Sequence, residues 1–310
     1  MQEGSSEGDD TGTGARDHLP TELVNERTRN LDDVSTADAL ELLTTEDEVA
    51  VAAVRKAHPA LEQVIDLATE RLGRGGRMFY VGAGTSGRLG TLDAAECPPT
   101  FSSAPEQVQA LIAGGKDALI RAVEGAEDDP DAASLELFAR KLTPTDLVIG
   151  IAAGGTTPYV HGAIAYARSI GAATAFLACV PFAAVPDEAD ISIRLDTGPE
   201  PLAGSTRMKA GTATKLALNA ISTLTMVRLG KVHGNRMVDV QARGNTKLVE
   251  RATSLVAELA GVDRELARQL LWSANWQVKT AVVMHQKGLD AAAATKLLAK
   301  VGGFLREALK

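Results

Sequence analysis

This sequence has few cysteines and few aromatic residues, and it has no excess of positive charge. Its two cysteines, Cys97 and Cys179, lie far apart and outside any C-x-x-C pattern, which excludes a disulfide framework and indicates reduced thiols in a cytosolic protein. The formal net charge is -8, so the basic excess typical of a nucleic-acid binder is missing. No apolar run reaches the roughly 18 residues of a membrane span, and no signal peptide is visible. We therefore expect neither nucleic acid nor membrane as a partner.

The composition that remains favours an α/β enzyme. Hydrophobic residues make up 45% of the 310 residues but aromatic residues only 4%. Such a balance, rich in alanine and glycine, suits close helix–sheet packing better than a β-sandwich. The first residues are rich in Gly, Ser, Thr, Asp and Glu, which predicts a disordered tail over residues 1–20.

Short apolar runs that end at glycines or turn residues alternate with helical patterns. Buried parallel strands have this character, and the alternation predicts βαβ units and a largely parallel sheet. The runs are Arg77–Gly84, Val108–Gly115, Asp146–Gly155, Ala172–Val180 and Asp190–Gly198.

Helical periodicity fills the rest of the chain. A short helix capped by Ser35 or Thr36 should follow the N-terminal arm, and Pro59 should kink or divide the next helical stretch, Val49–Leu72. Ser205–Gly230 reads as one long helix, with Ser205 or Thr206 as its N-cap and Gly230 as its stop. We predict an α/β domain over residues 21–244 and a small unit of about three helices over 245–310.

Two glycine-rich loops each follow a predicted strand and open a helix. They are "GAGTSGR" and "AAGGTTPY", and in a parallel sheet both would face one crevice with free N–H groups and the positive ends of helix dipoles. This pattern predicts a phosphate site. Its candidate residues are Gly84, Thr85, Ser86, Gly87, Gly155, Thr156 and Thr157.

A dinucleotide is the alternative ligand, because Gly82, Gly84 and Gly87 have the spacing of a dinucleotide-binding loop. A dinucleotide-binding fold requires a carboxylate at the end of its second strand to hold the ribose. Here the second predicted strand ends at Gly114 and Gly115, which disfavours a dinucleotide.

Three further groups of candidate site residues can also be interpreted as ordinary structural features. Glu96 precedes two prolines that should stop its helix, and a solvated helix-end carboxylate is the plain interpretation. Glu124, Glu127, Asp128 and Asp129 form an acidic cluster, which is usually a solvated loop. Ser205, Thr206, Arg207 and Lys209 open the long helix as either an anion site or simple capping with surface charge. The histidines are too far apart for a zinc site, so we expect no metal.

Several long segments, in order, resemble the N-acetylmuramic acid 6-phosphate etherase family, a group of sugar isomerase (SIS) domain proteins. "TELVNERTRNLDDVST" resembles the N-terminal arm of this family, and the similarity runs from about Thr21 to the chain end. The other segments are "YVGAGTSGRLGTLDAAECPPTF", "LIAGGKDALIRAVEGAEDD", "GIAAGGTTPYV", "GSTRMKAGTATKLALN" and "GKVHGNRMVDV".

The resemblance implies a SIS fold, a five-stranded parallel sheet flanked by helices, with a small C-terminal helical domain. It implies a cytoplasmic homodimer with sites near the subunit interface, no metal or organic cofactor, and cleavage of a D-lactyl ether from a phosphosugar. The two carboxylates of the family match Glu96 and Glu127, with Glu127 favoured over Glu124. Glu96 is assigned as proton donor to lactate and Glu127 as base, and the reverse assignment stays open. Ser205, Thr206 and Lys209 are expected at the phosphate.

One loop departs from the family pattern. Where the family has "AASGRTPY", Gly154 replaces a serine and Thr156 an arginine, which should weaken binding of the 6-phosphate. A non-catalytic sugar-phosphate regulatory protein is therefore one alternative function. An aldose–ketose isomerase is another, although it would not explain the segment around Glu96.

Overall fold

The protein was analysed as a computed structural model that describes residues 18–240 and 246–310. Residues 1–17 of the predicted tail, and the predicted domain boundary between 244 and 245, lie outside the described residues.

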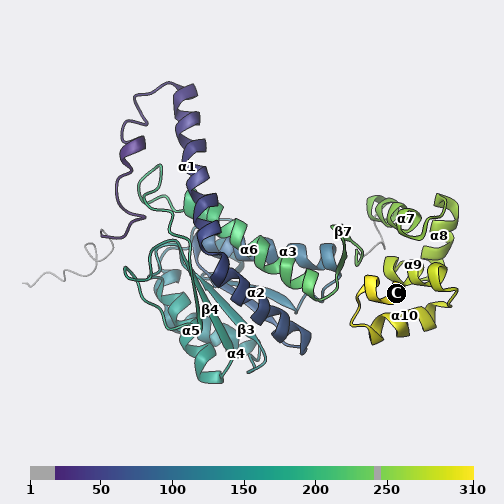
Figure 1. The fold of residues 1–310 in the computed structure, drawn as a ribbon. Coiled ribbons are helices and arrows are strands. Elements are labelled where there is room, and N and C mark those ends of the chain that lie inside the picture. The colour runs from purple at the N-terminus through teal and green to yellow at the C-terminus, as the bar shows by residue number, and fades with distance from the viewer. Residues whose placement is uncertain (1–17, 241–245) are drawn as a thin grey trace, which may run out of the picture.

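Among the described residues, a five-stranded parallel sheet with strand order β2-β1-β3-β4-β5 forms the centre of the α/β part (Figure 1). All five predicted strands are confirmed. In register, Tyr80 lies opposite Ala110 of β2 and Ile149 of β3. The strands are β1 (Met78–Gly82), β2 (Val108–Ile112), β3 (Leu147–Ile151), β4 (Ala173–Ala178) and β5 (Ile191–Arg194).

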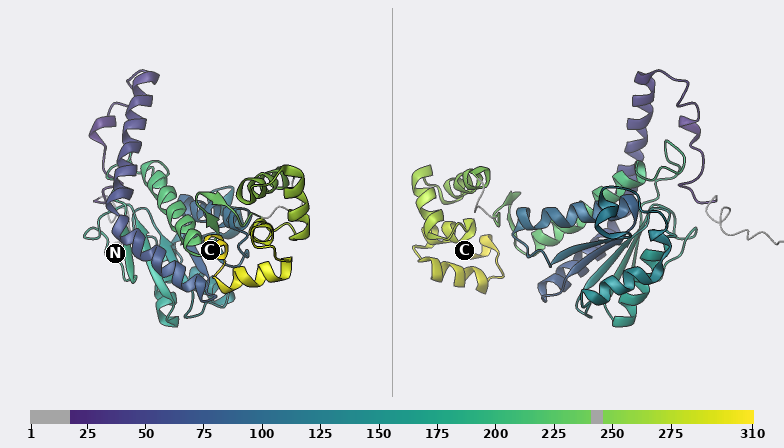
Figure 2. Two further views of the ribbon diagram at one scale, coloured as in Figure 1. Left: turned by 45° about the vertical axis from the view of Figure 1, so that its right-hand side comes forward. Right: turned by 180° about the vertical axis from the view of Figure 1, so that it is seen from behind.

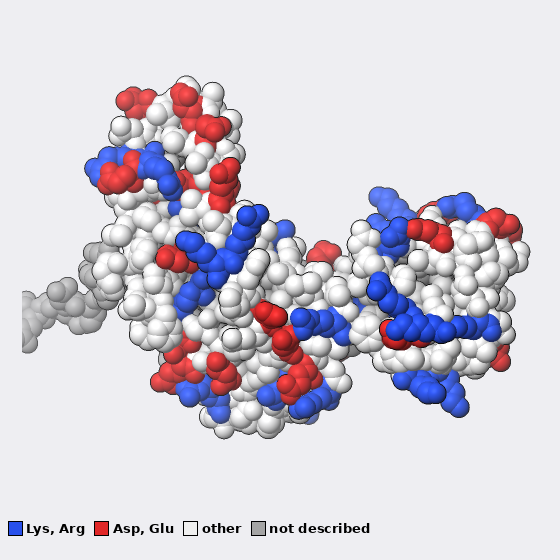
Figure 3. All heavy atoms as spheres, viewed as in Figure 1, with Lys and Arg blue, Asp and Glu red and all other residues white. Residues whose placement is uncertain are grey.

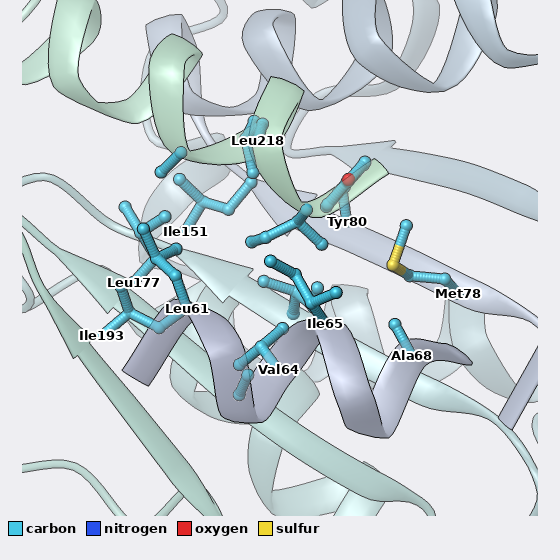
Figure 4. Close-up of a cluster of buried hydrophobic side chains, with 14 of the residues drawn as sticks. Leu61, Val64, Ile65, Ala68, Met78, Tyr80, Ile151, Leu177, Ile193 and Leu218 are labelled. Atoms are coloured by element: carbon cyan, nitrogen blue, oxygen red, sulfur yellow. The ribbon is translucent and has the colours of Figure 1, made fainter. Parts of the chain in front are cut away.

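Helices cover both faces of this sheet, which confirms the α/β fold. Alternate strand residues point to opposite faces, so Tyr80 packs with α2 and α6 while Phe79 packs with α4 and α5. Figure 4 shows the first of these cores, where Leu61 and Ile65 of α2 meet Tyr80 and Leu218. The first face carries α1 (Thr36–Lys56), α2 (His58–Gly73), α3 (Gly84–Phe101) and α6 (Lys209–Arg228), and the second carries α4 (Pro130–Ala139) and α5 (Pro158–Ile170).

The predicted helix boundaries at the N-terminal side are partly confirmed. Ser35 caps α1 by accepting the N–H of Asp38 at 3.2 Å. The helix is longer than predicted, because its pattern continues unbroken to Lys56. Pro59 does divide the stretch: Ala57 separates α1 from α2, and the proline sits in the first turn of α2, where its missing N–H costs no hydrogen bond.

Two predicted helix ends are wrong. Pro98 and Pro99 lie inside α3, which continues to Phe101 and closes with the Ser102 N–H on the Pro98 carbonyl at 2.9 Å. Each of these prolines removes one backbone hydrogen bond, and α3 ends within three residues of Pro98. The long helix α6 begins at Lys209, so Ser205 and Thr206 are not its cap. The buried Glu200 carboxylate accepts the N–H groups of Lys209 at 2.8 Å and Ala210 at 3.0 Å instead.

A buried ion pair fixes α1 against α6. The Nζ atom of Lys209 lies 2.5 Å from Oε2 of Glu46, and both side chains are 1% exposed. Glu46 also accepts hydrogen bonds from Asn25 at 2.8 Å and from Arg27, so the N-terminal arm joins the same cluster. Burial raises the pKa of Glu46, but the hydrogen bonds from Arg27, Lys209 and Asn25 outweigh it and hold that pKa below its usual value.

A helical unit follows a short hairpin of β6 (Val232–His233) and β7 (Arg236–Met237) and packs around its own apolar core (Figure 2). Lys279 ties it to the α/β part by donating to the Gly230 carbonyl at 3.2 Å. Lys279 also pairs with Asp239 and, within the helical unit, donates to the Gly303 carbonyl at 2.8 Å. Its described residues hold five helices rather than about three: α7 (Thr246–Ala260), α8 (Arg264–Ser273), α9 (Val278–Lys287), α10 (Ala291–Lys300) and α11 (Leu305–Leu309).

Lysine and arginine are mixed with aspartate and glutamate over both the α/β part and the helical unit on the face in Figure 3. In the described chain, no helix combines the length and the apolar character needed to cross a membrane.

Lys209→Met should destabilise the protein by about 3 kcal/mol, since removing one partner of a buried pair leaves the other charge poorly compensated. The stabilisation from ionised Glu46 is complete above its unfolded pKa of about 4.3 and is lost as pH falls through the lower folded pKa. Urea unfolding at neutral pH and below pH 4 measures both effects, and the difference between wild type and variant should narrow in acid. Arg29→Met, in the exposed pair with Glu26, is the control and should behave as wild type.

Candidate active site

The loops after β1 and β3 meet where the strand order of the sheet reverses. β1 lies between β2 and β3, so the chain leaves β1 toward one side and β3 toward the other, and the crevice between them is the usual ligand site of an open parallel sheet. One residue separates β1 from the start of α3 at Gly84, and six residues separate β3 from the start of α5 at Pro158. Two helix N-termini therefore face the same crevice.

Neither of these helix N-termini has a side-chain cap within the described residues, whereas α1 and α4 are capped by Ser35 and Asp129. The first N–H groups of a helix have no intrahelical partner, and the helix dipole favours an anion beside them. An anion of the size of phosphate satisfies both requirements.

A cavity of about 350 Å³ lies at these two N-termini. Seven of the predicted site residues line it, and they bring five hydroxyl groups together with one carboxylate. The seven are Gly84, Thr85, Ser86, Glu127, Thr156, Thr157 and Thr206.

Two predicted glycines, Gly87 and Gly155, shape the loops and do not line this cavity in the described chain. A Cβ on Gly87 would lie 2.6 Å from Cγ1 of Ile112, so only glycine lets α3 start this close to β2. Gly155 has a φ of +80° and donates its N–H to the Ala152 carbonyl at 2.9 Å, which turns the second loop.

Ser205 and Lys209 are also absent from the described lining of the cavity. Lys209 points to Glu46 on α1, where its ammonium is buried in the ion pair described above. Its expected contact with phosphate is thus replaced by a structural role. Ser205 lies in the turn before α6, where its carbonyl accepts the N–H of Met208 at 3.1 Å.

Glu96 lies on an exposed part of α3, outside the cavity. Twelve residues of helix separate it from Gly84, which corresponds to ~18 Å along the axis. The buried Asp93 one turn earlier fixes this part of α3, since it accepts hydrogen bonds from Tyr80 at 3.0 Å, Asn219 at 2.9 Å and Ser222 at 3.0 Å. Within one chain, Glu96 therefore lines neither of the cavities that Glu127 lines.

Glu127 sits in the short 3₁₀ helix η3 (Ala126–Asp128). It lines the cavity at the helix N-termini and also a neighbouring cavity of about 270 Å³, whereas Glu124 lines only the neighbour. Of the acidic cluster, Glu127 is therefore the member that faces the predicted phosphate loops.

The N-terminal arm supplies lining residues that sequence reasoning missed. Leu19 is buried in the cavity wall, and Glu22 adds a second carboxylate. Gly204 lets this carboxylate approach, because a Cβ there would lie 3.0 Å from Oε2 of Glu22. The "TELVNERT" segment resembled the family arm, but nothing in its pattern indicated that it reaches the cavity.

The possible metal ligands and the two thiols of the described residues do not form a second reactive site. In the described part of the chain, no group of three or more His, Cys, Asp or Glu side chains is placed to hold a metal ion. Burial, with Asp93 and Glu96 nearby, raises the pKa of Cys97 to about 12, and burial likewise raises the pKa of Cys179 to about 12. Both thiols therefore stay protonated and unreactive at neutral pH.

Comparisons with known proteins agree with this geometry. The family described as glucokinase regulatory protein N-terminal SIS domain matches residues 60–168. A proposed phosphosugar isomerase involved in capsule formation from Bacteroides fragilis has the same fold, with a TM-score of 0.51 at 17% identity over 69% of this chain and 99% of that one. The fold is thus that of the SIS-domain phosphosugar proteins.

Curated relatives identify the family within that class. N-acetylmuramic acid 6-phosphate etherase of Gloeobacter violaceus is 55% identical over 95% of this chain and 96% of its own length. The etherase of Nostoc punctiforme is 54% identical over 95% of both chains. The chain belongs to the N-acetylmuramic acid 6-phosphate etherase family.

Gly154→Ser should strengthen anion binding at the loop that departs from the family. A Cβ at Gly154 would make ordinary contacts, 3.6 Å from Cδ1 of Leu19 and 3.9 Å from Oγ1 of Thr21, so a serine fits without strain. Its hydroxyl adds a charge-assisted hydrogen bond, and we expect the Kd for inorganic phosphate to fall roughly 3- to 10-fold. Calorimetric titration measures this.

Gly84→Ser is the matched control for that substitution. Gly84 has a φ of +50°, which a serine adopts only with strain, so this variant should bind phosphate more weakly than wild type. Equal or weaker binding by Gly154→Ser would contradict the assignment of this loop to the phosphate.

Proposed function

We propose that this chain cleaves the D-lactyl ether of N-acetylmuramic acid 6-phosphate, giving N-acetylglucosamine 6-phosphate and D-lactate. The observation that carries the proposal is that Glu127 lines the same cavity as the two uncapped helix N-termini. A base beside a phosphate site is what proton abstraction from a phosphosugar requires.

The 6-phosphate binds to the loops that open α3 and α5. Backbone N–H groups at the start of α3 and in the loop before Pro158 donate to its oxygens, and the hydroxyls of Thr85, Ser86, Thr156 and Thr206 surround it. This arrangement binds a dianion with neutral donors, which explains how a chain of net charge -8 holds one.

The reaction is an elimination followed by hydration. Opening of the sugar ring makes C1 an aldehyde, which acidifies the C2 proton. Glu127 takes that proton, the C2–C3 double bond forms, and lactate leaves C3 as its ether oxygen gains a proton from Glu96. Water then adds to C3 of the unsaturated aldehyde and a proton returns to C2. The net change is hydrolysis of the ether, and the reverse assignment of acid and base gives the same balance.

Glu127→Gln should lower kcat by roughly 10²- to 10⁴-fold, since it removes the base that takes the C2 proton. D-lactate release measures turnover, and solvent deuterium at C2 of the product reports the proton abstraction. Glu124→Gln, three residues away, is the control and should retain near wild-type turnover. Full activity of Glu127→Gln with loss in Glu124→Gln would reverse the assignment.

The separation of Glu96 from the cavity leads us to propose a homodimer with composite sites. Two proton-transfer groups are needed within reach of one substrate, and α3 carries Glu96 ~18 Å from Gly84. The same exposed side of α3 presents Leu92, which is 52% exposed one turn before Glu96. In a twofold dimer, α3 of one copy would bring its Glu96 to the cavity of the other. Such a dimer would work in the cytoplasm, on phosphosugar substrate.

Mixing two inactive variants tests the composite site. If Glu96 and Glu127 of one site come from different subunits, a mixed dimer of Glu96→Gln and Glu127→Gln has one intact site and one doubly altered site. Random pairing makes half of the dimers mixed, so co-expression should recover roughly a quarter of wild-type activity. Purified mixed dimers that stay inactive would instead assign both glutamates to one chain.

The etherase is favoured over a non-catalytic regulatory protein. The glucokinase regulatory protein domain matches only residues 60–168, whereas the etherase relatives match 95% of the chain. Incubation of the purified protein with N-acetylmuramic acid 6-phosphate and assay of D-lactate separates the two: a regulatory protein would bind the sugar and release nothing.

A further inference from the structure

A second cavity, of about 270 Å³, adjoins the one at the helix N-termini. Ala83, Gly84 and Glu127 line both, so the two cavities meet at the proposed base. The far wall of the second cavity is largely apolar, with Ala113 and Ala118 buried in it. A substrate on the phosphate loops would therefore have the second cavity beside it, next to Glu127.

Arg88 is the single lysine or arginine that lines either cavity, among the residues that the structure describes. It lies in the second turn of α3, after the phosphate loop, and is half-buried. Its Nε atom donates to the Leu119 carbonyl and its Nη2 atom to the Arg121 carbonyl, each at 3.3 Å. These neutral partners orient the guanidinium without neutralising it, and none of the described carboxylates forms an ion pair with it.

The substrate carries two anionic groups, the phosphate at C6 and the carboxylate of the lactyl group that leaves C3. The 6-phosphate is held by the helix N-termini, and the lactyl group at C3 ends in a carboxylate. We infer that the second cavity binds the lactyl carboxylate through Arg88, with Glu127 between the two anions and beside C2. This inference rests on the proposed function.

The charges that face the cavity explain why a cation is needed there. Glu124 and Asp128 line it as well, and both are exposed to solvent. They repel a carboxylate, although water screens them. A guanidinium offers a planar pair of N–H donors that match the two oxygens of a carboxylate, so Arg88 offsets this repulsion and fixes the lactyl group in one orientation. The alanine side chains leave room for its methyl group.

Arg88 is then a specificity-determining residue rather than part of the phosphate site. N-acetylglucosamine 6-phosphate keeps the phosphate and loses the lactyl group, so its affinity should not depend on Arg88. D-lactate carries the carboxylate away, so its affinity as a product should depend on Arg88.

Arg88→Gln should raise KM for N-acetylmuramic acid 6-phosphate about 10- to 100-fold, the effect of losing hydrogen bonds to a charged group. Inhibition by N-acetylglucosamine 6-phosphate should stay at the wild-type level. The KM of Arg88→Lys should lie between those of wild type and Arg88→Gln, because lysine keeps the charge and loses the planar pair of donors. Arg121→Gln is the matched control: this arginine is exposed, lies outside both cavities and faces Asp117 at 3.6 Å.

A substrate whose lactyl carboxylate is replaced by a carboxamide tests the same contact on the intact protein. Wild type should bind it more weakly than the natural substrate by a factor similar to the effect of Arg88→Gln, and the variant should no longer discriminate between the two. Equal weakening of both phosphosugars in the variants, or full discrimination by Arg88→Gln, would overturn the inference. Failure of the wild-type protein to release D-lactate would overturn the proposed function itself. The wild-type measurement therefore separates a failure of the proposed function from a failure of the inference about Arg88.

Discussion

The N-termini of α3 and α5, which have no side-chain cap in the described residues, are the constraint around which this structure is organised. Both helices leave the sheet at the point where the strand order reverses, and the described residues give neither a side-chain cap. The first turn of such a helix and its dipole favour water or an anion beside them. Gly87 brings the first helix close enough to β2 for its N-terminus to face the crevice. The catalytic proposal follows from what else that crevice contains.

The distant N-terminal arm completes the cavity, and a buried ion pair holds it there. Lys209 opens α6 directly after the loop that carries Thr206, and Glu46 joins it from α1. Because Asn25 and Arg27 bond to the same carboxylate, the arm residues before them are fixed as well. Leu19 and Glu22 thereby reach the wall of the cavity. The one lysine expected to bind phosphate instead positions the segment that encloses it.

The strands could be predicted because each is a short apolar run that ends at a turn, and that pattern needs no tertiary information. Glu127 came from family resemblance, since its acidic cluster alone looks like a solvated loop. Lys209 was misassigned because cation spacing at a helix start does not tell which way a long side chain points. The start of α6 was misplaced because its cap, Glu200, lies nine residues before Lys209. The places of Glu22 and Arg88 in the cavity walls could not be predicted, because only the tertiary structure brings these residues there.

Neutral donors bind the phosphate, and charged groups contact the rest of the substrate. This division explains how one fold serves different phosphosugar chemistries. Helix N-termini bind a phosphate wherever this loop geometry occurs, so they do not distinguish an ether from an aldose. Discrimination must come from groups beyond the phosphate loops. In our proposal these groups are Glu127, which lines both cavities, and Arg88, which lines the second. A cation beside the departing carboxylate holds the leaving group while the base acts at C2. Elimination rather than isomerisation is then the outcome that this arrangement of charges favours.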